Sequence, residues 1–234
     1  MTVPLLSVVV PTWNEAGTLE GLLADLGRLD VPHEVVVVDG GSTDGTVAVG
    51  LGLGATVVTS ARGRGRQLRA GAAAASGPYL CFLHADVRLP DDTLRVLALL
   101  ARACRPGACA FQLAIDSPRW SYRVVEFGSR LRSTLLALPY GDQGLAIARE
   151  TYERVGGFDD VPLMEDVRIA RALTRVGGIA LHHETVVVSA RRWERDGVWR
   201  RTFANGVLLA RYLAGASPES LVRRYASADA HTPD

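Results

Sequence analysis

Short, largely apolar runs recur through the first half of the chain, and segments with helical spacing separate them. The runs lie at residues 6–10, 35–38, 55–59 and 79–83. After the first run, leucines recur at helical spacing, at Leu19, Leu22, Leu23, Leu26 and Leu29. Apolar strands that alternate with helices are typical of a parallel sheet covered on both sides. The sequence therefore predicts an α/β fold with a mostly parallel central sheet between two layers of helices.

The remaining elements are expected from the same patterns. In the first half, helices are predicted from Asp44, with Ser42 or Thr43 as the cap, and over residues 67–75 and 91–102. The second half is less regular, with predicted strands at 111–115 and 186–188, and helices at 121–138, 165–176, 197–213 and 218–225. No repeat or long linker divides the chain, so we expect one domain over residues 1–234.

Polar residues follow three of the predicted strands. Thr12, Asn14 and Glu15 come after the first strand, Asp39 ends the second, and Asp86 follows the fourth. In parallel α/β sheets, ligands bind beyond the carboxyl ends of the strands. These side chains are therefore expected to form a single site.

The composition excludes several classes of protein. The 234 residues include no lysine, which rules out a Walker-type ATPase and an aldolase that forms a Schiff base. A formal net charge of +1 gives no general attraction to nucleic acid, so no nucleic-acid partner is expected. Three cysteines form no disulfide framework, and neither a signal peptide nor an apolar run long enough to span a membrane is recognisable. We therefore expect a cytoplasmic protein.

Five motifs stand in a fixed order within about residues 6–195: Pro11-Thr12-Trp13-Asn14-Glu15, Asp39-Gly40-Gly41-Ser42, Gly63-Arg64-Gly65-Arg66-Gln67, Leu83-His84-Ala85-Asp86 and Leu163-Met164-Glu165-Asp166. In this order and spacing they resemble the inverting family 2 glycosyltransferases, within them a small bacterial non-processive subgroup. The resemblance implies a GT-A fold, with a donor-binding half at about residues 1–115 and an acceptor half at about 116–234.

The resemblance also implies the reaction. A hexosyltransferase of this kind moves a sugar from a nucleotide diphosphate donor, here favoured to be a UDP-sugar, to the hydroxyl of a small-molecule or lipid-linked acceptor. Donor binding is assigned to the following residues: Pro11, Thr12, Asn14, Glu15, Asp39, Arg66, Gln67, Ala85 and Asp86. Asp39 would accept a hydrogen bond from the base or the ribose. Its alternative role is to end the strand in a turn.

The metal motif departs from the pattern of the family. The usual Asp-x-Asp is replaced by His84-Ala85-Asp86. Asp86 is the expected ligand of a divalent cation, Mg²⁺ or Mn²⁺, because such cations prefer oxygen ligands. His84 is either a second ligand or a structural histidine that shapes the pocket.

Four arginines lie in or beside the third motif: Arg62, Arg64, Arg66 and Arg69. Guanidinium groups suit phosphate oxygens, and glycines let the backbone approach an anion closely. We expect Arg66 and Gln67 to contact the donor and Arg69 to face solvent. The alternative is a solvated basic loop.

Two acids begin the helix predicted at 165–176. By resemblance, Asp166 is the base that removes the proton of the acceptor hydroxyl, with Glu165 as the second candidate. The alternative is that both acids only complement the dipole of the helix.

The acceptor side is assigned to Asp142, Gln143, Arg192 and Trp193. Arg192-Trp193 stands where processive members carry a Gln-x-x-Arg-Trp motif, but the glutamine and the flanking membrane spans are missing. This favours a single transfer. Trp193 either stacks on a sugar or packs in the core.

Two other functions and one partner stay open. A sugar-phosphate nucleotidyltransferase would carry a Gly-rich basic loop after the first strand, which this chain lacks. A non-catalytic nucleotide-sugar or glycan-binding module would lack Asp86 or Asp166, and both are present. The apolar stripe of residues 197–213, beside Arg200, Arg201 and Arg211, either faces the core or makes a peripheral contact with a membrane at its inner face.

Overall fold

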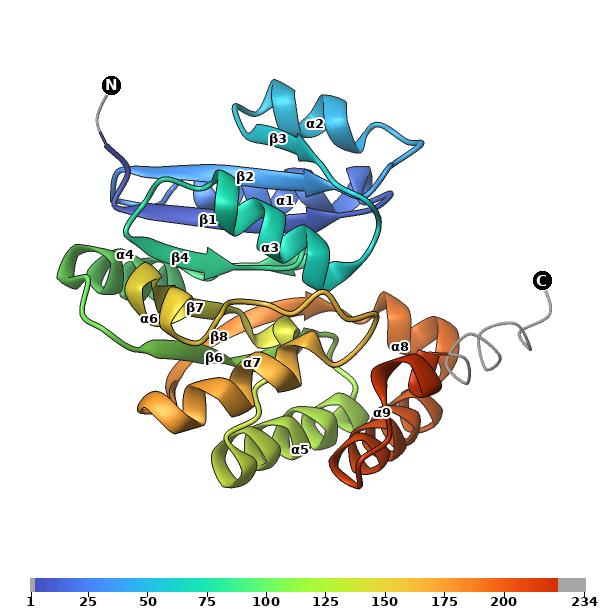
Figure 1. Ribbon diagram of the computed structural model, residues 1–234. Coiled ribbons are helices and arrows are strands. Elements are labelled where there is room, and N and C mark those ends of the chain that lie inside the picture. Colours follow the sequence, from blue (N-terminus) through green and yellow to red (C-terminus); the bar gives the residue numbers. More distant parts are fainter. Residues whose placement is uncertain (1–2, 223–234) are drawn as a thin grey trace.

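A computed structural model describes residues 3–222. Its central sheet has eight strands in the order β3-β2-β1-β4-β7-β6-β8-β5. The strands span β1 Leu6–Thr12, β2 His33–Asp39, β3 Thr56–Thr59, β4 Tyr79–Phe82, β5 Val87–Arg88, β6 Ala108–Asp116, β7 Leu145–Ala148 and β8 Ile179–Ser189. β1 runs parallel to both β2 and β4, β2 to β3, and β6 to β8, whereas β7 is antiparallel to its neighbours β4 and β6. The predicted α/β fold with a mostly parallel sheet is confirmed (Figure 1).

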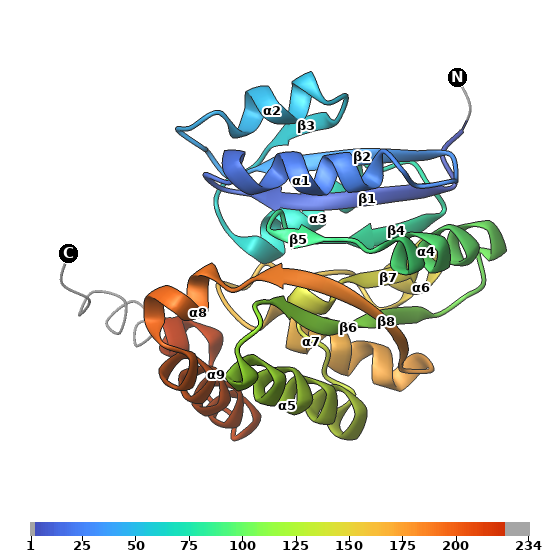
Figure 2. The same cartoon turned by 180° about the vertical axis from the view of Figure 1, so that it is seen from behind.

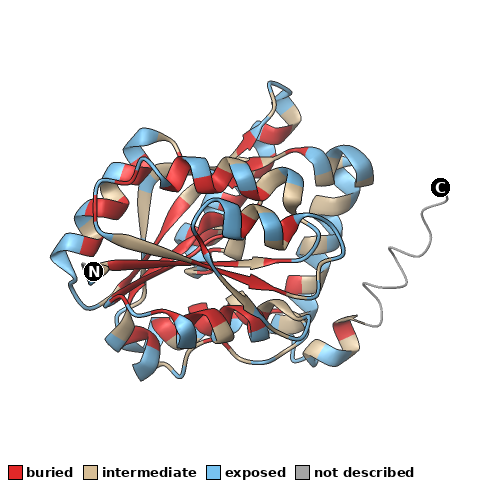
Figure 3. Ribbon diagram, turned by 90° about the horizontal axis from the view of Figure 1, so that it is seen from above, coloured by how far each residue is buried: buried red, intermediate tan, exposed pale blue. Residues whose placement is uncertain are grey.

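Helices cover both faces of this sheet (Figure 3). The helices span α1 Ala16–Leu26, α2 Thr46–Gly52, α3 Arg64–Ala74, α4 Asp91–Ala103, α5 Trp120–Leu136, α6 Arg149–Arg154, α7 Glu165–Leu173, α8 Arg191–Asp196 and α9 Val198–Leu213, with short 3-10 turns η1 Gly141–Gln143 and η2 Thr174–Val176. Val8 and Val10 point into one apolar core with α1, α4 and α5, while Val9 points into the other with α3, α6 and α7. This alternation is the two-residue period of a strand that is buried on both faces.

Two helix starts differ from the sequence prediction. α2 begins after Gly45, and neither Ser42 nor Thr43 caps it. The Ser42 hydroxyl instead donates to the Asp39 carboxylate, so the expected cap is wrong because that side chain closes the turn after β2. α3 begins at Arg64, three residues before the predicted start. Its arginines therefore lie on a helix and not on a loop.

The last strand of the sheet is longer than expected. β8 spans Ile179–Ser189, whereas the apolar pattern predicts residues 186–188 alone. The polar residues His182, His183 and Glu184 interrupt the apolar pattern, so the first half of the strand is not predicted from the sequence. Backbone pairing with β6 over most of its length extends the strand regardless of side-chain polarity.

The helix predicted over residues 197–213 is present as α9. Of the helix predicted over residues 218–225, residues 218–222 are helical, and the rest lies outside the described residues. Within residues 3–222, no helix combines the length and the hydropathy that crossing a bilayer requires.

Candidate active site

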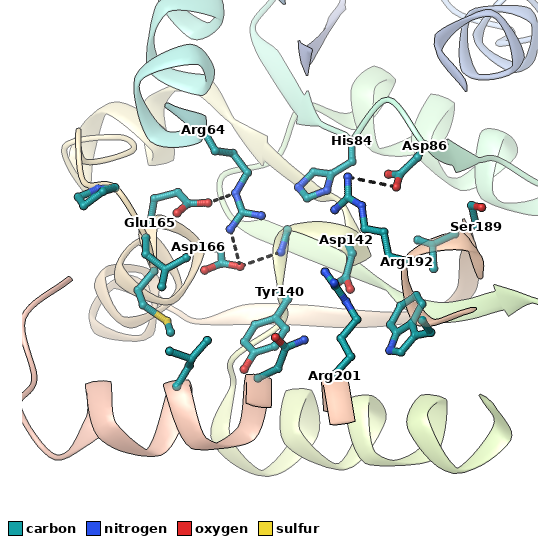
Figure 4. A pocket seen from close by; sticks show the side chains of 18 of the residues that line it. Arg64, His84, Asp86, Tyr140, Asp142, Glu165, Asp166, Ser189, Arg192 and Arg201 are labelled. Atoms are coloured by element: carbon teal, nitrogen blue, oxygen red, sulfur yellow. Dashed lines mark hydrogen bonds and ion pairs between the residues drawn. The ribbon is translucent and has the colours of Figure 1, made fainter. Parts of the chain in front are cut away.

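A cavity of about 470 Å³ opens beyond the ends of β4 and β8 (Figure 4). Segments far apart in the sequence form it: the start of α3, the loop after β4, the turn η1, the start of α7, and the helices α8 and α9. Its charged and ionisable lining residues are Arg62, Arg64, His84, Asp86, Tyr140, Asp142, Glu165, Asp166, Arg192 and Arg201. The cavity thus brings together acids and arginines from both halves of the chain.

One wall of the cavity is built on the start of α7. Met164 precedes the helix with a φ of 69°, in the left-handed region that non-glycine residues rarely adopt. Glu165 is 1% exposed and accepts a hydrogen bond from the Arg64 guanidinium. Burial raises the pKa of Glu165, and the positive charge of Arg64 opposes that shift. Gly65 lets α3 approach the segment before α7 closely, since a Cβ there would lie 2.2 Å from the backbone oxygen of Asp159.

Asp166 lies beside this pair and reaches the cavity. Its Oδ2 accepts a hydrogen bond from the Gly141 N–H at 3.2 Å and lies 3.7 Å from Nη2 of Arg64. Its side chain keeps 14% of its surface exposed, against 2% for Glu165. Of the two predicted acids, Asp166 is the one that an incoming molecule can reach.

The opposite wall follows β4 and carries His84 and Asp86 (Figure 4). Burial, followed by the positive charge of Arg64, lowers the pKa of His84 to about 4, so the imidazole is neutral at neutral pH. Its Nε2 is buried and has no hydrogen-bond partner. A Cβ on residue 141 would approach this atom to 2.9 Å, which explains why glycine stands there. Asp86 makes an ion pair with Arg192, at 3.5 Å.

These residues meet part of what a divalent cation needs. The Asp86 carboxylate faces the cavity with a single long contact, and the neutral His84 has an unpartnered ring nitrogen nearby. Within the described part of the chain, however, no three potential ligands converge. The protein therefore offers a partial ligand set, as Mg²⁺ sites that rely on water and substrate phosphate do.

The floor of the cavity comes from η1. Asp142 has a buried carboxylate oxygen without a hydrogen-bond partner, and burial raises its pKa. The neighbouring Gln143 does not line the cavity. Its fully buried side chain accepts hydrogen bonds from Ser133 and Arg132 and donates one to the backbone oxygen of Phe111. Gln143 thus holds the turn in place, while Asp142 faces the cavity.

None of the predicted donor residues at the ends of β1 and β2 lines the cavity. The Asp39 carboxylate accepts hydrogen bonds from the N–H groups of Gly41 and Ser42, at 2.9 Å each, and from the Ser42 hydroxyl. Asn14 accepts one from the Thr43 N–H. The structure therefore gives Asp39 the turn-closing contacts that the alternative interpretation expects. The strand-end residues outside the cavity lining are Pro11, Thr12, Asn14, Glu15 and Asp39; Ala85, beside Asp86, is buried in the core.

The two residues favoured for phosphate contact also point elsewhere. Arg66 makes a bidentate ion pair with Asp160, and Gln67 donates to the backbone oxygens of Thr12 and Val38, at 2.8 Å each. Neither side chain lines the cavity, whereas Arg62 and Arg64 do. Because α3 begins at Arg64, Arg64 and Arg66 point to opposite sides of the helix. The sequence pattern placed the start of this helix at Gln67, so it did not predict which arginine faces the cavity.

The helices α8 and α9 close one side of the cavity. Arg192 lies 3.5 Å from Glu15 as well as from Asp86, so it connects the first strand end to the cavity. Trp193 lines the cavity and packs edge-to-face on Tyr122, so the core packing expected as one of its two alternatives is present. Tyr140, Arg201 and Asn205 also line the cavity and were not predicted. No motif marks Arg201 and Asn205, because α9 reaches the cavity only through tertiary packing, whereas Tyr140 directly precedes η1.

The fold resembles several solved structures. A mannosyltransferase from Pyrobaculum calidifontis, PcManGT, in complex with GDP-Man and Mn²⁺, superposes with a TM-score of 0.65 at 22% identity, over 100% of this chain and 77% of that chain. Glucosyl-3-phosphoglycerate synthase from Mycobacterium tuberculosis, in complex with Mn²⁺, UDP and glucosyl-3-phosphoglycerate, superposes with a TM-score of 0.60 at 23% identity. The match covers 86% of this chain and 78% of that chain. Residues 1–349 of TarS from S. aureus give 0.60 at 20% identity, over 87% of this chain and 65% of the TarS fragment.

Sequence comparison gives the family. No curated protein sequence matches the chain. The family model described as glycosyl transferase family 2 matches residues 7–158, which include the four motifs between Pro11 and Asp86. The resemblance seen in the sequence is confirmed: this chain belongs to glycosyl transferase family 2 and has the GT-A fold.

Proposed function

We propose that the chain transfers one sugar from a nucleotide diphosphate donor to an acceptor hydroxyl, with inversion at the anomeric carbon and without processive polymerisation. The observation that carries this proposal is the pair of carboxylates facing each other across the cavity, Asp166 on α7 and Asp86 after β4 (Figure 4). Such an arrangement separates proton removal at the acceptor from charge neutralisation at the donor phosphates.

Asp166 is the proposed general base. Its Oδ2 is oriented by the Gly141 N–H and by Arg64, and its side chain is open to the cavity. Glu165, buried and bonded to Arg64, is a positioning residue in this scheme, because it holds the guanidinium beside Asp166. A proton from the acceptor hydroxyl would move to Asp166 as the acceptor oxygen attacks the sugar.

The donor diphosphate is proposed to lie between the arginines and Asp86. Arg62, Arg64 and Arg192 line the cavity and can neutralise phosphate oxygens. Mg²⁺ or Mn²⁺, held by Asp86 with or without His84, would screen the charge of the leaving diphosphate. Two of the similar structures contain Mn²⁺ together with UDP or GDP-Man, which supports a nucleotide donor with a cation, and we favour a UDP-sugar.

The base and ribose of the donor are proposed to sit at the strand ends of the first half, residues 1–115, beside Asp39 and Glu15. The acceptor, a small molecule or a lipid-linked group, would enter from the second half, residues 116–234, beside Asp142 and Trp193. The two halves act as one domain in this scheme. The free cysteines Cys81, Cys104 and Cys109 suit a reducing compartment, so we place the reaction in the cytoplasm.

A donor screen tests the proposal. Thermal unfolding is recorded with UDP-, GDP- and dTDP-sugars, each with Mn²⁺, with Mg²⁺ or with a chelator. A cognate donor at about 100 times its Kd adds about 2.7 kcal/mol of stability. Release of nucleotide diphosphate on adding acceptors, with an inverted product anomer by NMR, would support transfer. Pyrophosphate release from a sugar 1-phosphate and a nucleoside triphosphate would instead identify a nucleotidyltransferase. Binding without any turnover would identify a binding module.

A further inference from the structure

Large apolar side chains are exposed along one side of α5. Trp120, Val124, Phe127, Leu131 and Leu135 follow each other at intervals of three or four residues, so they form one stripe. Their exposed fractions run from 46% for Val124 to 71% for Trp120. The opposite side of the helix, with Tyr122 and Val125, packs into the core. The stripe is therefore a second apolar face of the same helix.

α9 continues this surface. Trp199, Phe203, Val207 and Leu213 are exposed at 53%, 73%, 38% and 45%, while Leu208, Leu209 and Tyr212 on the other side pack against the protein. The helices lie side by side in Figures 1 and 2, and the ring centroids of Trp120 and Trp199 are 6.1 Å apart. We call these nine exposed side chains the α5–α9 face. The sequence left open whether residues 197–213 face the core; the structure shows one side of α9 packed against the protein and the other side exposed.

The charges on these two helices are strongly one-sided. They carry six of the 26 basic residues of the chain and one of its 25 acidic residues. Arg123, Arg130, Arg200 and Arg211 are exposed on them. The single acid, Glu126, is already bonded to the Ile115 N–H and paired with Arg123. The chain is near neutral overall, but the two helices that expose these apolar side chains carry a net positive charge.

We propose that the α5–α9 face binds the surface of an anionic lipid bilayer. Apolar helices that lie in a membrane interface combine tryptophan, phenylalanine and leucine with flanking arginines, which attract anionic headgroups. Tryptophan suits the interface because its ring is apolar and its N–H is polar. A second copy of the chain is a poorer occupant, since a symmetric contact would place arginines against arginines with no free acid on either helix to pair with them.

The position of the cavity fits this orientation. Arg201, Asn205 and Leu208 line the cavity from α9, the helix whose exposed side carries Phe203 and Val207. A bilayer on the α5–α9 face would therefore lie next to the wall of the cavity assigned to the acceptor. This consequence rests on the proposed function, whereas the binding of the bilayer itself does not.

Vesicle flotation of the full chain tests the proposal without any activity assay. The vesicles are phosphatidylcholine alone, or phosphatidylcholine and phosphatidylglycerol in equal parts. We expect binding to the anionic vesicles, with a blue shift of tryptophan emission, and weaker binding at high salt. Replacing both phenylalanines, Phe127→Ser with Phe203→Ser, should lower the partition coefficient by at least about tenfold. Each of Arg130→Gln and Arg211→Gln should lower it by about fivefold.

Leu51→Ser is the matched control, because Leu51 is 59% exposed on α2, at the other end of the molecule (Figure 1). This variant should bind as the wild type does. Equal binding of the wild type and the double phenylalanine variant would overturn the proposal, as would equal binding to neutral and anionic vesicles. Light scattering provides the remaining test: a wild-type dimer that the double variant converts to a monomer, with no vesicle binding, would assign the face to a second copy instead.

Discussion

The buried carboxylates of the two halves of this protein are treated in opposite ways. In the first half, Asp25 is 3% exposed and accepts hydrogen bonds from Arg88, Arg28 and the Leu89 N–H. Burial acts to raise its pKa, but these contacts lower the pKa below the ordinary value. At the cavity, burial instead raises the pKa of Asp142 and of Glu165.

The number of partners explains the difference. Glu34, like Asp25, is surrounded by donors: Ser7, the hydroxyl and N–H of Ser76, and the Gly77 N–H. Asp142 has an oxygen with no partner, and the charges of Asp166 and Asp86 act on it in addition to burial. Hydrogen-bond donors around a carboxylate stabilise its ionised form, whereas neighbouring acids and a lack of donors destabilise it.

The contrast indicates where stability and function lie. The carboxylates of the first half connect elements of the fold, since Asp25 ties α1 to β5 and Glu34 ties β2 to the loop before β4. At the cavity, burial and neighbouring acids disfavour the ionised forms of Asp142 and Glu165, and the nearby arginines do not fully offset this effect. Charge crowding of this kind is typical of sites that bind or react. Four experiments can break or sharpen the comparison, in order of decreasing effect.

The largest effect is expected from Asp166→Asn. The amide keeps the shape of the side chain but cannot accept a proton, so sugar transfer should fall by roughly 10²–10⁴-fold while donor binding stays close to that of the wild type. Steady-state transfer and donor titration measure the two quantities. Asp159→Asn is the control, because Asp159 lies on the preceding loop and pairs with Arg168 outside the cavity. Transfer within a few-fold of the wild type would exclude Asp166 as the base and make Glu165 the next candidate.

Asp25→Ala tests the structural side of the comparison. Its loss leaves the Leu89 N–H without its partner and removes the carboxylate that pairs with Arg88, so the free energy of unfolding should fall by about 2–3 kcal/mol. Urea denaturation measures this change. The exposed Asp92, paired with Arg95, gives the matched variant Asp92→Ala, which should cost less than about 1 kcal/mol. Equal losses in both variants would show that burial of the Asp25 network adds nothing.

The pH dependence of stability should reveal the same network. The pKa of Asp25 is lowered from 3.8 in the folded state, so the unfolded chain binds more protons in acid. Its contribution is present above the unfolded pKa and is lost as pH falls through the folded pKa. Between about pH 6 and about pH 3, Asp25→Asn should therefore lose about 1 kcal/mol less stability than the wild type. Parallel acid limbs for the two proteins would contradict the prediction.

The smallest effect, with the opposite sign, is expected from Asp142→Asn. The raised pKa of Asp142 means that its contribution is present below the unfolded pKa and is lost as pH rises through the folded pKa. Removing the charge should raise the free energy of unfolding by about 0.5–1 kcal/mol at neutral pH, and the gain should vanish below about pH 4. Asp30→Asn, at an exposed carboxylate, serves as the control. A destabilised Asp142→Asn variant would remove the contrast between the two regions.

Much of the fold could be predicted because its signals are local. The apolar runs at residues 6–10 and 79–83 became β1 and β4, since a strand that is buried on both faces must be apolar at every position. The polar half of β8 could not be predicted, because its pairing with β6 depends on a strand some seventy residues away. The predicted cap of α2 was wrong for a related reason. The Ser42 hydroxyl can bond either to the start of the helix or to the carboxylate of Asp39, and in the structure it bonds to Asp39.

The sequence by itself determined the family, because the order and spacing of its motifs can be recognised without any coordinates. Through that resemblance it also predicted roles for Asp86 and Asp166 in one active site. The tertiary structure alone decided which neighbours share that site. Arg64 faces the cavity and Arg66 does not, because α3 begins three residues early and successive positions on a helix point in different directions. Likewise, a net charge of +1 and an average composition conceal the α5–α9 face, since a sum over the chain carries no information on where packing places each side chain.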